Sequence, residues 1–368
     1  MGTEAMSRLT IHWICPEPTP YHADFFNELH KDPNVSLEVH FMAEGFPGHP
    51  WQRKPNMHFP HRIINLRCWF DFHLLLLALE PANKFIVSGW NSPFLIFFIL
   101  WLTLLRREFL FWADTPNPSK ERPMLKRLLL RVVSTLTFRG AHKVLGTGLP
   151  GTEAFSAMGC PIDKIMSFPY FAAITDYDPS LKESSLSDHL VVVSVGRLEN
   201  AVKGFDIGLK ALGQVKWSGI PYRFEFLICG SGPDLDRLRH DAEELGLGED
   251  VKFLGWLESD DVTAILKRAH IMLHPAIWEP FGLVILEAMI NGVVVVGSEA
   301  TCAVRDRITH GHNGFVHPVG DVDKIVDQLT ALFCDRERLR RMGIAARRSA
   351  EEWPLSRGVE IIKSAFRD

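Results

Sequence analysis

Neither a paired-cysteine pattern nor a secretory leader is expected from this sequence. Its six cysteines are scattered, with no C-x-x-C pair and no metal-ligand spacing, which argues against a disulfide framework and favours reduced thiols. Residues 1–7 lack an apolar core, so we expect no secretory signal. Gly2 does not fit a myristoylation site, because Met6 stands where that motif has Ser or Thr. We therefore expect a cytoplasmic protein.

The sequence also has no large excess of positive or negative charge and no long apolar run. A net charge of −4 with 46% apolar residues excludes a disordered chain and gives no reason to expect a nucleic-acid partner. The apolar run 94–105 is shorter than the ~20 residues that a membrane-spanning helix needs. We interpret this run as a buried crossover helix. The alternative is a helix that dips into a membrane surface.

A basic amphipathic segment follows that run. Within residues 119–139, Lys126, Arg127 and Arg131 share a helical face beside a leucine-rich one. Such helices can attach to the anionic inner face of a membrane, which makes that surface a candidate partner. A charged face that is simply solvated, on a helix of the core, is the alternative.

Strand-like and helix-like segments alternate along most of the chain. Alternation of this kind predicts an α/β fold, with parallel sheets covered by helices on both faces. Length and the polar, turn-rich stretch before residue 189 predict two domains, 1–172 and 189–354, joined by a linker at 173–188. In the first half the expected strands cover residues 9–15, 36–42, 84–88, 108–112 and 143–146.

The segment after residue 189 carries a candidate diphosphate site. A buried strand, 189–195, runs directly into Gly196, which allows a tight turn there. Arg197 and Lys203 stand between this strand and the next helix, where a diphosphate would bind. Another strand, 224–229, ends in a Gly-Ser-Gly-Pro turn that begins at Gly230. A surface Arg and Lys without a ligand is the alternative interpretation.

The stretch 274–297 carries the most specific pattern and reads as loop, helix and strand. Glu279 lies in the loop, and Glu287 lies inside the helix with its side chain directed back toward the helix N-terminus. The free amides of Phe281, Gly282 and Leu283 should point into the same space, so a hydroxyl-rich ligand could meet acceptors and donors together. An amphipathic helix with a surface Glu at each end is the alternative.

These segments together resemble the retaining, nucleotide-sugar-dependent glycosyltransferases of family four. The shared motifs are E-x7-E from Glu279 to Glu287, G-R-x-x-x-x-K-G at 196–204 and G-x-G-P at 230–233. The resemblance implies the GT-B fold, in which two Rossmann-like domains face each other across a cleft. It also implies that a final helix, 355–368, crosses back onto the first domain. Residues 297–308 depart from the family pattern, which leaves the donor sugar open.

The resemblance also assigns roles to individual residues. Arg197 and Lys203 would bind the diphosphate, and Glu287 would accept hydrogen bonds from the ribose hydroxyls. Glu279, with the amides near Phe281 and Gly282, would orient the donor sugar. Many relatives have a catalytic-region His after the strand that ends here at residue 112, and Asp114 is the nearest candidate to replace it. His22, in the first βα loop, is another polar candidate.

We expect no metal ion and no bound cofactor in this protein. Three D-x-D patterns, at 176–178, 234–236 and 321–323, fall in linker or helix-start settings, and Arg197 and Lys203 could neutralise a diphosphate instead. No H-E-x-x-H pattern occurs. A dehydrogenase would need G-x-G-x-x-G after the first strand, where Pro16–Pro20 stands.

The sequence therefore predicts a retaining, metal-independent, hexosyltransferase-like enzyme. It would move a sugar from a UDP- or GDP-linked donor to a glycan, lipid-linked or small-molecule acceptor, in polysaccharide, glycolipid or other glycoconjugate synthesis. With a lipid-linked acceptor, the protein would be peripheral on the inner face of the membrane. The alternative is a module that binds a nucleotide sugar without transferring it. The base, the sugar and the acceptor are not encoded in any motif recognised here.

Overall fold

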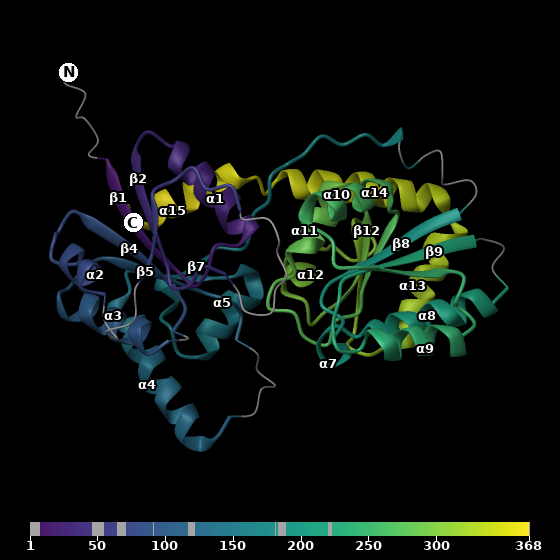
Figure 1. The fold of residues 1–368 in the computed structure, drawn as a ribbon, viewed down its shortest axis with the longest axis horizontal. Coiled ribbons are helices and arrows are strands. Elements are labelled where there is room, and N and C mark those ends of the chain that lie inside the picture. The colour runs from purple at the N-terminus through teal and green to yellow at the C-terminus, as the bar shows by residue number, and fades with distance from the viewer. Residues whose placement is uncertain are drawn as a thin grey trace. The chain divides into compact units, whose positions relative to one another are not determined.

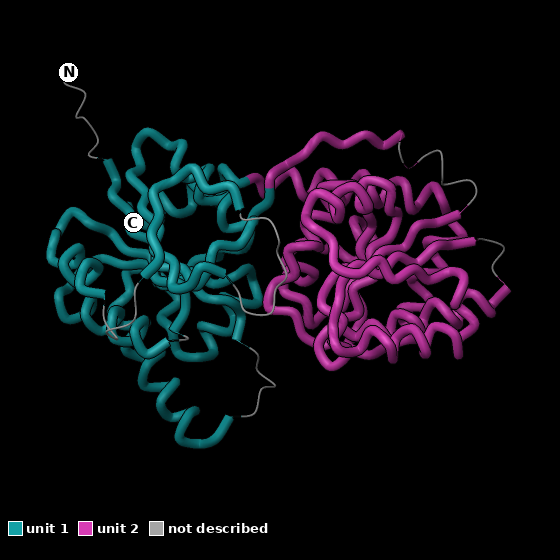
Figure 2. Tube along the Cα trace, viewed as in Figure 1, with its two compact units in different colours: residues 1–172, 355–368 teal, residues 173–354 magenta. Residues whose placement is uncertain are grey.

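The computed structural model describes residues 8–45, 55–64, 71–90, 92–116, 122–180, 182, 189–219 and 223–367. Part of the expected linker, residues 181 and 183–188, lies outside these ranges, as do the first residues of the basic segment, 119–121. The chain divides into two compact units (Figure 2). Unit 1 comprises residues 1–172 and 355–368, and unit 2 comprises residues 173–354.

Unit 1 contains a seven-stranded sheet in the order β3-β2-β1-β4-β5-β6-β7, in which every pairing is parallel. Its strands are β1 (Leu9–Cys15), β2 (Val35–Phe41), β3 (His61–Ile63), β4 (Asn83–Ser88), β5 (Phe109–Ala113), β6 (Lys143–Gly146) and β7 (Ile165–Ser167). Its helices are α1 (Pro20–Lys31), α2 (Phe72–Leu77), α3 (Pro93–Leu104), α4 (Met124–Gly140), α5 (Gly148–Ala157) and α15 (Leu355–Ala365) (Figure 1). A 3₁₀ turn, Ile162–Lys164, precedes β7.

Unit 2 contains a six-stranded parallel sheet in the order β10-β9-β8-β11-β12-β13. Its strands are β8 (His189–Val195), β9 (Arg223–Cys229), β10 (Val251–Gly255), β11 (Ile271–His274), β12 (Val294–Ser298) and β13 (Gly314–His317). Its helices are α7 (Asn200–Lys203), α8 (Phe205–Trp217), α9 (Leu235–Glu244), α10 (Ser259–Arg268), α11 (Leu283–Ile290), α12 (Cys302–Arg307), α13 (Val322–Cys334) and α14 (Arg336–Glu351).

Both sheets have the strand order of a dinucleotide-binding fold, which confirms the expected α/β architecture of two Rossmann-like units. Central strands such as β4 and β12 are buried along most of their length because helices cover both faces, and this explains their continuous apolar sequence. Residues at the N-terminus of α1 fix the position where this helix begins. Thr19 caps α1 by accepting from the His22 amide, and Pro20 follows at the first helical position.

The apolar run 94–105 forms α3, which lies largely inside unit 1. Its buried residues are Phe94, Leu95, Phe98, Ile99 and Leu102. Within the described ranges, no helix combines the length and the apolar character that a bilayer crossing requires. One face of this run therefore serves the core of unit 1, whereas Leu100 and Leu104 are exposed.

Helix α4 differs from α3, because the side that it turns to solvent is apolar. It packs on α3 through a few residues near its C-terminal end, and its N-terminal half extends beyond the rest of unit 1 (Figure 1). The solvent-exposed surface of α4 therefore includes apolar side chains as well as the basic side chains of Lys126, Arg127 and Arg131. The large apolar residues that α4 exposes are Met124, Leu125, Leu128, Leu129, Val132 and Leu136.

Candidate functional site

The candidate donor site lies where the strand order of unit 2 reverses. Strand β8 pairs with β9 on one side and with β11 on the other, so the loops that follow β8 and β11 diverge from one point at the carboxyl edge of the sheet. Ligands of open α/β sheets bind at this kind of switch point. The backbone joins the two loops, because the amides of Ile277 and Trp278 both donate to the carbonyl of Val202, at 2.9 and 3.1 Å.

Two glycine-containing loops meet backbone to backbone at this edge. A Cβ atom on Gly230 would overlap the carbonyl oxygen of Gly196, and the φ of Gly230 is +148°. The Leu198 amide donates to the Ser231 carbonyl at 2.9 Å, which continues the same contact. Gly230 is therefore required for packing of the loop that carries Arg197 and Lys203, whether or not it also touches a ligand.

Lys203 and Glu279 form an ion pair between the two loops. The lysine ends α7 and the glutamate lies in the loop after β11, and their side chains are only 19% and 12% exposed. Arg197 is different, because its side chain is 58% exposed and its nearest acid is Glu199, at 3.5 Å. Of the three catalytic side chains predicted in unit 2, the structure thus brings Lys203 and Glu279 into contact and leaves Arg197 at the surface.

The loop that carries Glu279 is held by backbone hydrogen bonds from the first two residues of α12. The Cys302 amide donates to the Glu279 carbonyl at 3.2 Å, and the Ala303 amide donates to the Phe281 carbonyl at 2.8 Å. Gly282 has a φ of +87°, and a Cβ there would lie 3.0 Å from the Glu279 Cγ. The backbone conformation that only glycine adopts easily therefore sets the position of the Glu279 side chain.

Helix α11 begins at Leu283, directly after Gly282, and no side chain closes its N-terminus with a capping hydrogen bond. Glu287 lies in the second turn and is half-buried, and its carbonyl accepts from the Asn291 side chain at 2.9 Å. The predicted amides and both predicted glutamates therefore belong to one loop and the helix that follows it. This arrangement suits a ligand with acceptor oxygens at the helix end.

Two buried histidines that we did not predict adjoin this site. His274, the last residue of β11, places its Nε2 3.8 Å from the Glu279 Oε2. Burial and the nearby Lys203 charge lower the pKa of His274 to about 3, so the imidazole is neutral and this contact is not an ion pair. His317, at the end of β13, donates from Nδ1 to the Pro318 carbonyl at 2.8 Å. Burial lowers its pKa as well.

The predicted residues of unit 1 are linked through a tyrosine that the sequence did not single out. The Tyr170 hydroxyl donates to Asp114 Oδ1 at 3.0 Å, and its ring stacks on His22 with a centroid distance of 6.0 Å. His22 is half-buried, and desolvation lowers its pKa to about 4. Its Nδ1 lies 3.5 Å from the Cys15 sulfur. Asp114 is exposed. Unit 1 therefore presents a neutral imidazole, a phenol and a carboxylate in one cluster.

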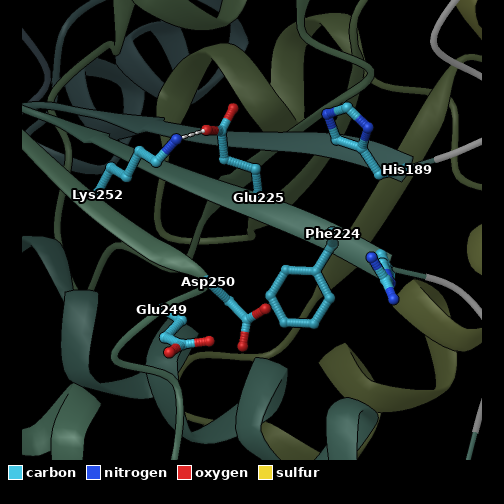
Figure 3. A pocket seen from close by; sticks show the side chains of 7 residues that line it. His189, Phe224, Glu225, Glu249, Asp250 and Lys252 are labelled. Atoms are coloured by element: carbon cyan, nitrogen blue, oxygen red, sulfur yellow. Dashed lines mark hydrogen bonds and ion pairs between the residues drawn. The ribbon is translucent and has the colours of Figure 1, made fainter.

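A concave surface of about 620 Å³ in unit 2 lies at the opposite edge of the sheet (Figure 3). It is formed near the amino ends of β8, β9 and β10 and is crossed by the Lys252–Glu225 ion pair. Parallel sheets bind ligands at their carboxyl edge, so we do not assign the donor to this hollow. Its lining residues are His189, Arg223, Phe224, Glu225, Glu249, Asp250 and Lys252.

Comparison with known proteins relates unit 2 to a family of transferases. Residues 179–349 match the family model described as Glycosyl transferases group 1. The chain is 35% identical over 128 residues to the N-acetyl-alpha-D-glucosaminyl L-malate synthase of Bacillus anthracis, covering 35% of this chain and 33% of that protein. It is 29% identical over 259 residues to the D-inositol 3-phosphate glycosyltransferase of Nocardia farcinica, covering 67% of this chain and 54% of that protein.

These matches span about a third to about half of the two curated relatives. Solved structures resemble the whole chain. The crystal structure of HepE from Anabaena in complex with UDP superposes with a TM-score of 0.78 and 20% identity, covering 97% of this chain and 99% of that one. The same protein has also been crystallised in complex with UDP-glucose. At this identity the likeness shows the fold, which confirms the two Rossmann-like domains of the GT-B type.

Replacing Gly230 with Ala should destabilise unit 2. The new Cβ meets the Gly196 carbonyl and the backbone conformation disfavours a side chain, so we expect a loss of about 3 kcal/mol in the free energy of unfolding. Gly311→Ala is the matched control, because Gly311 also has a positive φ, +78°, but open space around it. Equal urea-unfolding curves for the two variants would contradict the proposed loop contact.

Replacing His274 with Gln should make the free energy of unfolding less dependent on pH below pH 7. The native imidazole stays neutral to about pH 3, whereas an unfolded histidine binds a proton near pH 6.5. The contribution of His274 to the free energy of unfolding is therefore complete above pH 6.5. It is lost as the pH falls, by at most about 1.4 kcal/mol per pH unit. Between pH 7 and 5, wild-type protein should lose about 2 kcal/mol more unfolding free energy than the variant in urea titrations. The exposed His312→Gln variant should match wild type.

Proposed function

We propose that the protein transfers a sugar from a nucleoside diphosphate sugar to an acceptor, because residues 179–349 match the group 1 glycosyl transferases and the chain has the GT-B fold. The observation that carries this proposal is the Lys203–Glu279 pair. It places a cation for a diphosphate and an acceptor for sugar hydroxyls beside the uncapped N-terminus of α11.

The proposed donor is a uridine or guanosine diphosphate sugar held on unit 2. Lys203 and Arg197 would bind the diphosphate oxygens, and Glu287 would accept from the ribose hydroxyls. UDP-sugars are the first to test, because HepE is similar in fold and its solved structures include UDP and UDP-glucose. A role for Lys203 in binding requires it to exchange the Glu279 carboxylate for the diphosphate. Glu279 is then released to accept from the donor sugar.

Retention of anomeric configuration and independence of metal ions complete the proposed mechanism. The bond between the anomeric carbon and the diphosphate oxygen breaks, and the acceptor oxygen bonds to the same face of the sugar. The acceptor proton can pass to the departing phosphate oxygen. The negative charge of the leaving diphosphate is stabilised by Lys203, Arg197 and the α11 amides, which are preorganised donors of the kind that dominate electrostatic catalysis.

We assign acceptor recognition to unit 1. Its cluster of His22, Tyr170 and Asp114 offers a neutral imidazole, a phenol and a carboxylate, and such groups recognise hydroxyl-bearing molecules. Curated relatives include a putative colanic acid biosynthesis glycosyltransferase and the D-inositol 3-phosphate glycosyltransferases. Synthesis of a polysaccharide, glycolipid or other glycoconjugate is therefore the proposed role.

Helix α4 supports peripheral attachment to the cytoplasmic face of a membrane. Six large apolar side chains are exposed on it, and its sequence contains four basic residues and no acid. An apolar face flanked by basic residues binds the interface of an anionic bilayer. A lipid-linked acceptor would then be available to unit 1.

The transfer reaction is tested by kinetics with UDP- and GDP-sugars. Arg197→Ala and Lys203→Ala should each lower kcat/KM by roughly 10²- to 10³-fold, because each removes a preorganised cation from the leaving diphosphate. Lys210→Ala and Arg239→Ala are matched controls in unit 2, where both side chains are 56% exposed. Lys203→Met with Glu279→Gln removes both charges, which separates loss of catalysis from the cost of an unpaired buried carboxylate.

Two results would overturn this proposal. One is an unchanged kcat/KM in both the Arg197 and Lys203 variants. The other is calorimetric binding of a nucleotide sugar without release of nucleoside diphosphate in any acceptor extract, which would identify a binding module. Full activity after chelation of divalent ions is expected for a diphosphate that is neutralised by protein cations alone. Loss of activity that Mg²⁺ or Mn²⁺ restores would contradict metal independence.

Membrane attachment predicts co-sedimentation with anionic but not neutral vesicles at low ionic strength. Each basic residue near an anionic surface contributes about 1 kcal/mol, so Lys126→Glu with Arg127→Glu should reduce binding, as should added salt. Leu125→Ser with Leu129→Ser tests the apolar face separately. Lys210→Glu, on unit 2, is the control. Equal partitioning onto both vesicle types, or onto neither, would point to an acceptor in solution.

A further inference from the structure

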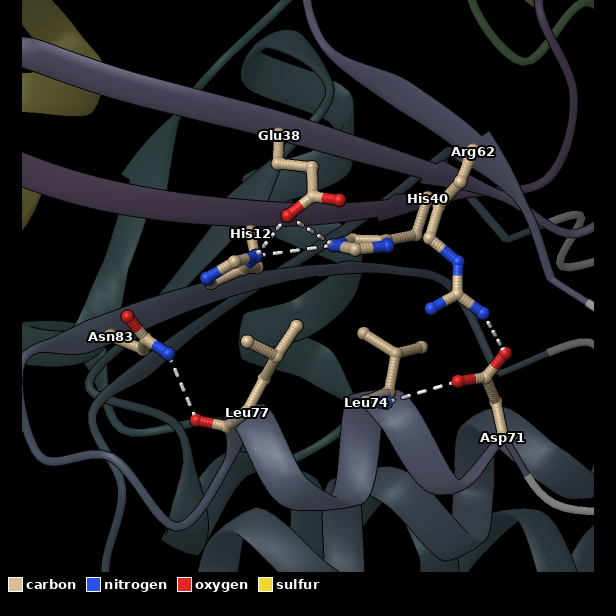
Figure 4. Close-up of polar contacts among 8 residues, drawn as sticks. All are labelled: His12, Glu38, His40, Arg62, Asp71, Leu74, Leu77 and Asn83. Carbon is tan, nitrogen blue, oxygen red and sulfur yellow. Dashed lines mark hydrogen bonds and ion pairs between the residues drawn. The ribbon is translucent and has the colours of Figure 1, made fainter.

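Three metal-binding side chains meet on one face of the unit 1 sheet. His12 on β1 is paired in register with Glu38 on β2, and His40 follows two residues later on β2, so all three side chains project from the same face. The His12 Nδ1 lies 3.1 Å from the His40 Nε2 and 3.4 Å from the Glu38 Oε2. The His40 Nε2 lies 3.9 Å from the same carboxylate oxygen (Figure 4).

These separations are those of donor atoms around one small cation. Zinc is bound at about 2.0–2.2 Å by imidazole nitrogen and carboxylate oxygen in a tetrahedral arrangement, so two of its ligand atoms stand roughly 3.3–3.5 Å apart. The three distances here, 3.1, 3.4 and 3.9 Å, bracket that spacing. Two histidines and one carboxylate are also a ligand set that zinc uses when a fourth position is left for water or another ligand.

A fixed polar side chain adjoins the His12 ring. Asn83 lies on the side of the ring away from His40 and Glu38 (Figure 4). The Asn83 Nδ2 donates to the Leu77 carbonyl at 3.0 Å, which holds the amide in place. Fixed polar groups beside a metal-binding imidazole help to orient its ring.

One atom of each side chain, His12 Nδ1, His40 Nε2 and Glu38 Oε2, faces the other two. A cation placed among these three atoms would make three favourable contacts at once. Arg62, which is opposite His40 on β3, helps to lower the pKa of His40. Its ion pair with Asp71 offsets part of that positive charge.

The cluster is buried on the sheet side and open on one edge. His12 and His40 are 5% and 0% exposed, whereas the Glu38 side chain is 33% exposed and gives an entry path. His73, at the exposed start of α2, has its ring centroid 6.4 Å from that of His40. The site lies in the middle of β1 and beneath α2, while the residues assigned to the diphosphate belong to unit 2.

We propose that His12, Glu38 and His40 bind one divalent transition-metal ion, for which zinc is the best match, and that this ion stabilises the attachment of β1 to β2 beneath α2. The role is structural and independent of the proposed transfer reaction. Imidazole nitrogen with carboxylate oxygen favours zinc over magnesium or calcium, which bind through oxygen.

The test uses the full chain without an affinity tag, stripped with a chelator and then given zinc alone. Elemental analysis should find one zinc per chain after dialysis, and zinc in large excess over its Kd should raise Tm by about 5 °C. Cobalt in place of zinc should give the visible absorption of a four- or five-coordinate ion. The rate of sugar transfer by the zinc-free protein, measured below its own Tm, should stay within about two-fold of the zinc-loaded rate.

Variants distinguish this site from surface binding. Glu38→Gln, at a half-exposed position, should weaken zinc binding at least about 10-fold, because it removes the charged ligand oxygen. His240→Gln is the control, because His240 forms an exposed pair with Glu244 on α9 that could bind zinc adventitiously. Absence of bound zinc in wild type, or binding that survives Glu38→Gln but is lost in His240→Gln, would overturn the proposal.

Discussion

A mostly buried ion pair between Lys203 and Glu279 is the contact on which the candidate donor site depends. It joins the loop after β8 to the loop after β11, and the Val202 carbonyl joins the same two loops through the backbone. Removing either charge alone would strand the other in a poorly solvated position, which costs more than removing both. The pair therefore fixes the two loops at the switch point and holds the lysine close to its assigned place.

Sequence pattern located most of the fold because buried parallel strands are apolar throughout. The expected strand 9–15 coincides with β1, and 36–42 differs from β2 by one residue at each end. The pattern missed β3 and β7, which have three residues each and are partly exposed edge strands. Such short strands carry no hydrophobic run of their own, and only pairing with a neighbour makes them strands.

The part of the candidate site that could be predicted is the part whose residues lie in one continuous segment. Glu279, Gly282 and Glu287 share a single loop and helix, so their proximity follows from local geometry. His317 and Tyr170 were missed because the sheet order and the tertiary fold, not the sequence, bring them to their partners. His274 is in the same segment as Glu279, but a lone histidine at the end of a strand gave no sign of that contact. Helix α4 shows the same limit. Periodicity identified its leucine-rich face but could not tell that this face lies toward solvent.

Burial keeps the His274 imidazole uncharged beside Glu279. A protonated imidazole 3.8 Å from Glu279 would compete with Lys203 for the same carboxylate. The low-dielectric surroundings and the lysine charge keep the pKa of His274 near 3, so it adds no charge at neutral pH. Glu279 is then balanced by Lys203, and a diphosphate that draws the lysine away leaves a carboxylate beside a neutral ring. That carboxylate is free to accept hydrogen bonds from a sugar, which a second cation would prevent.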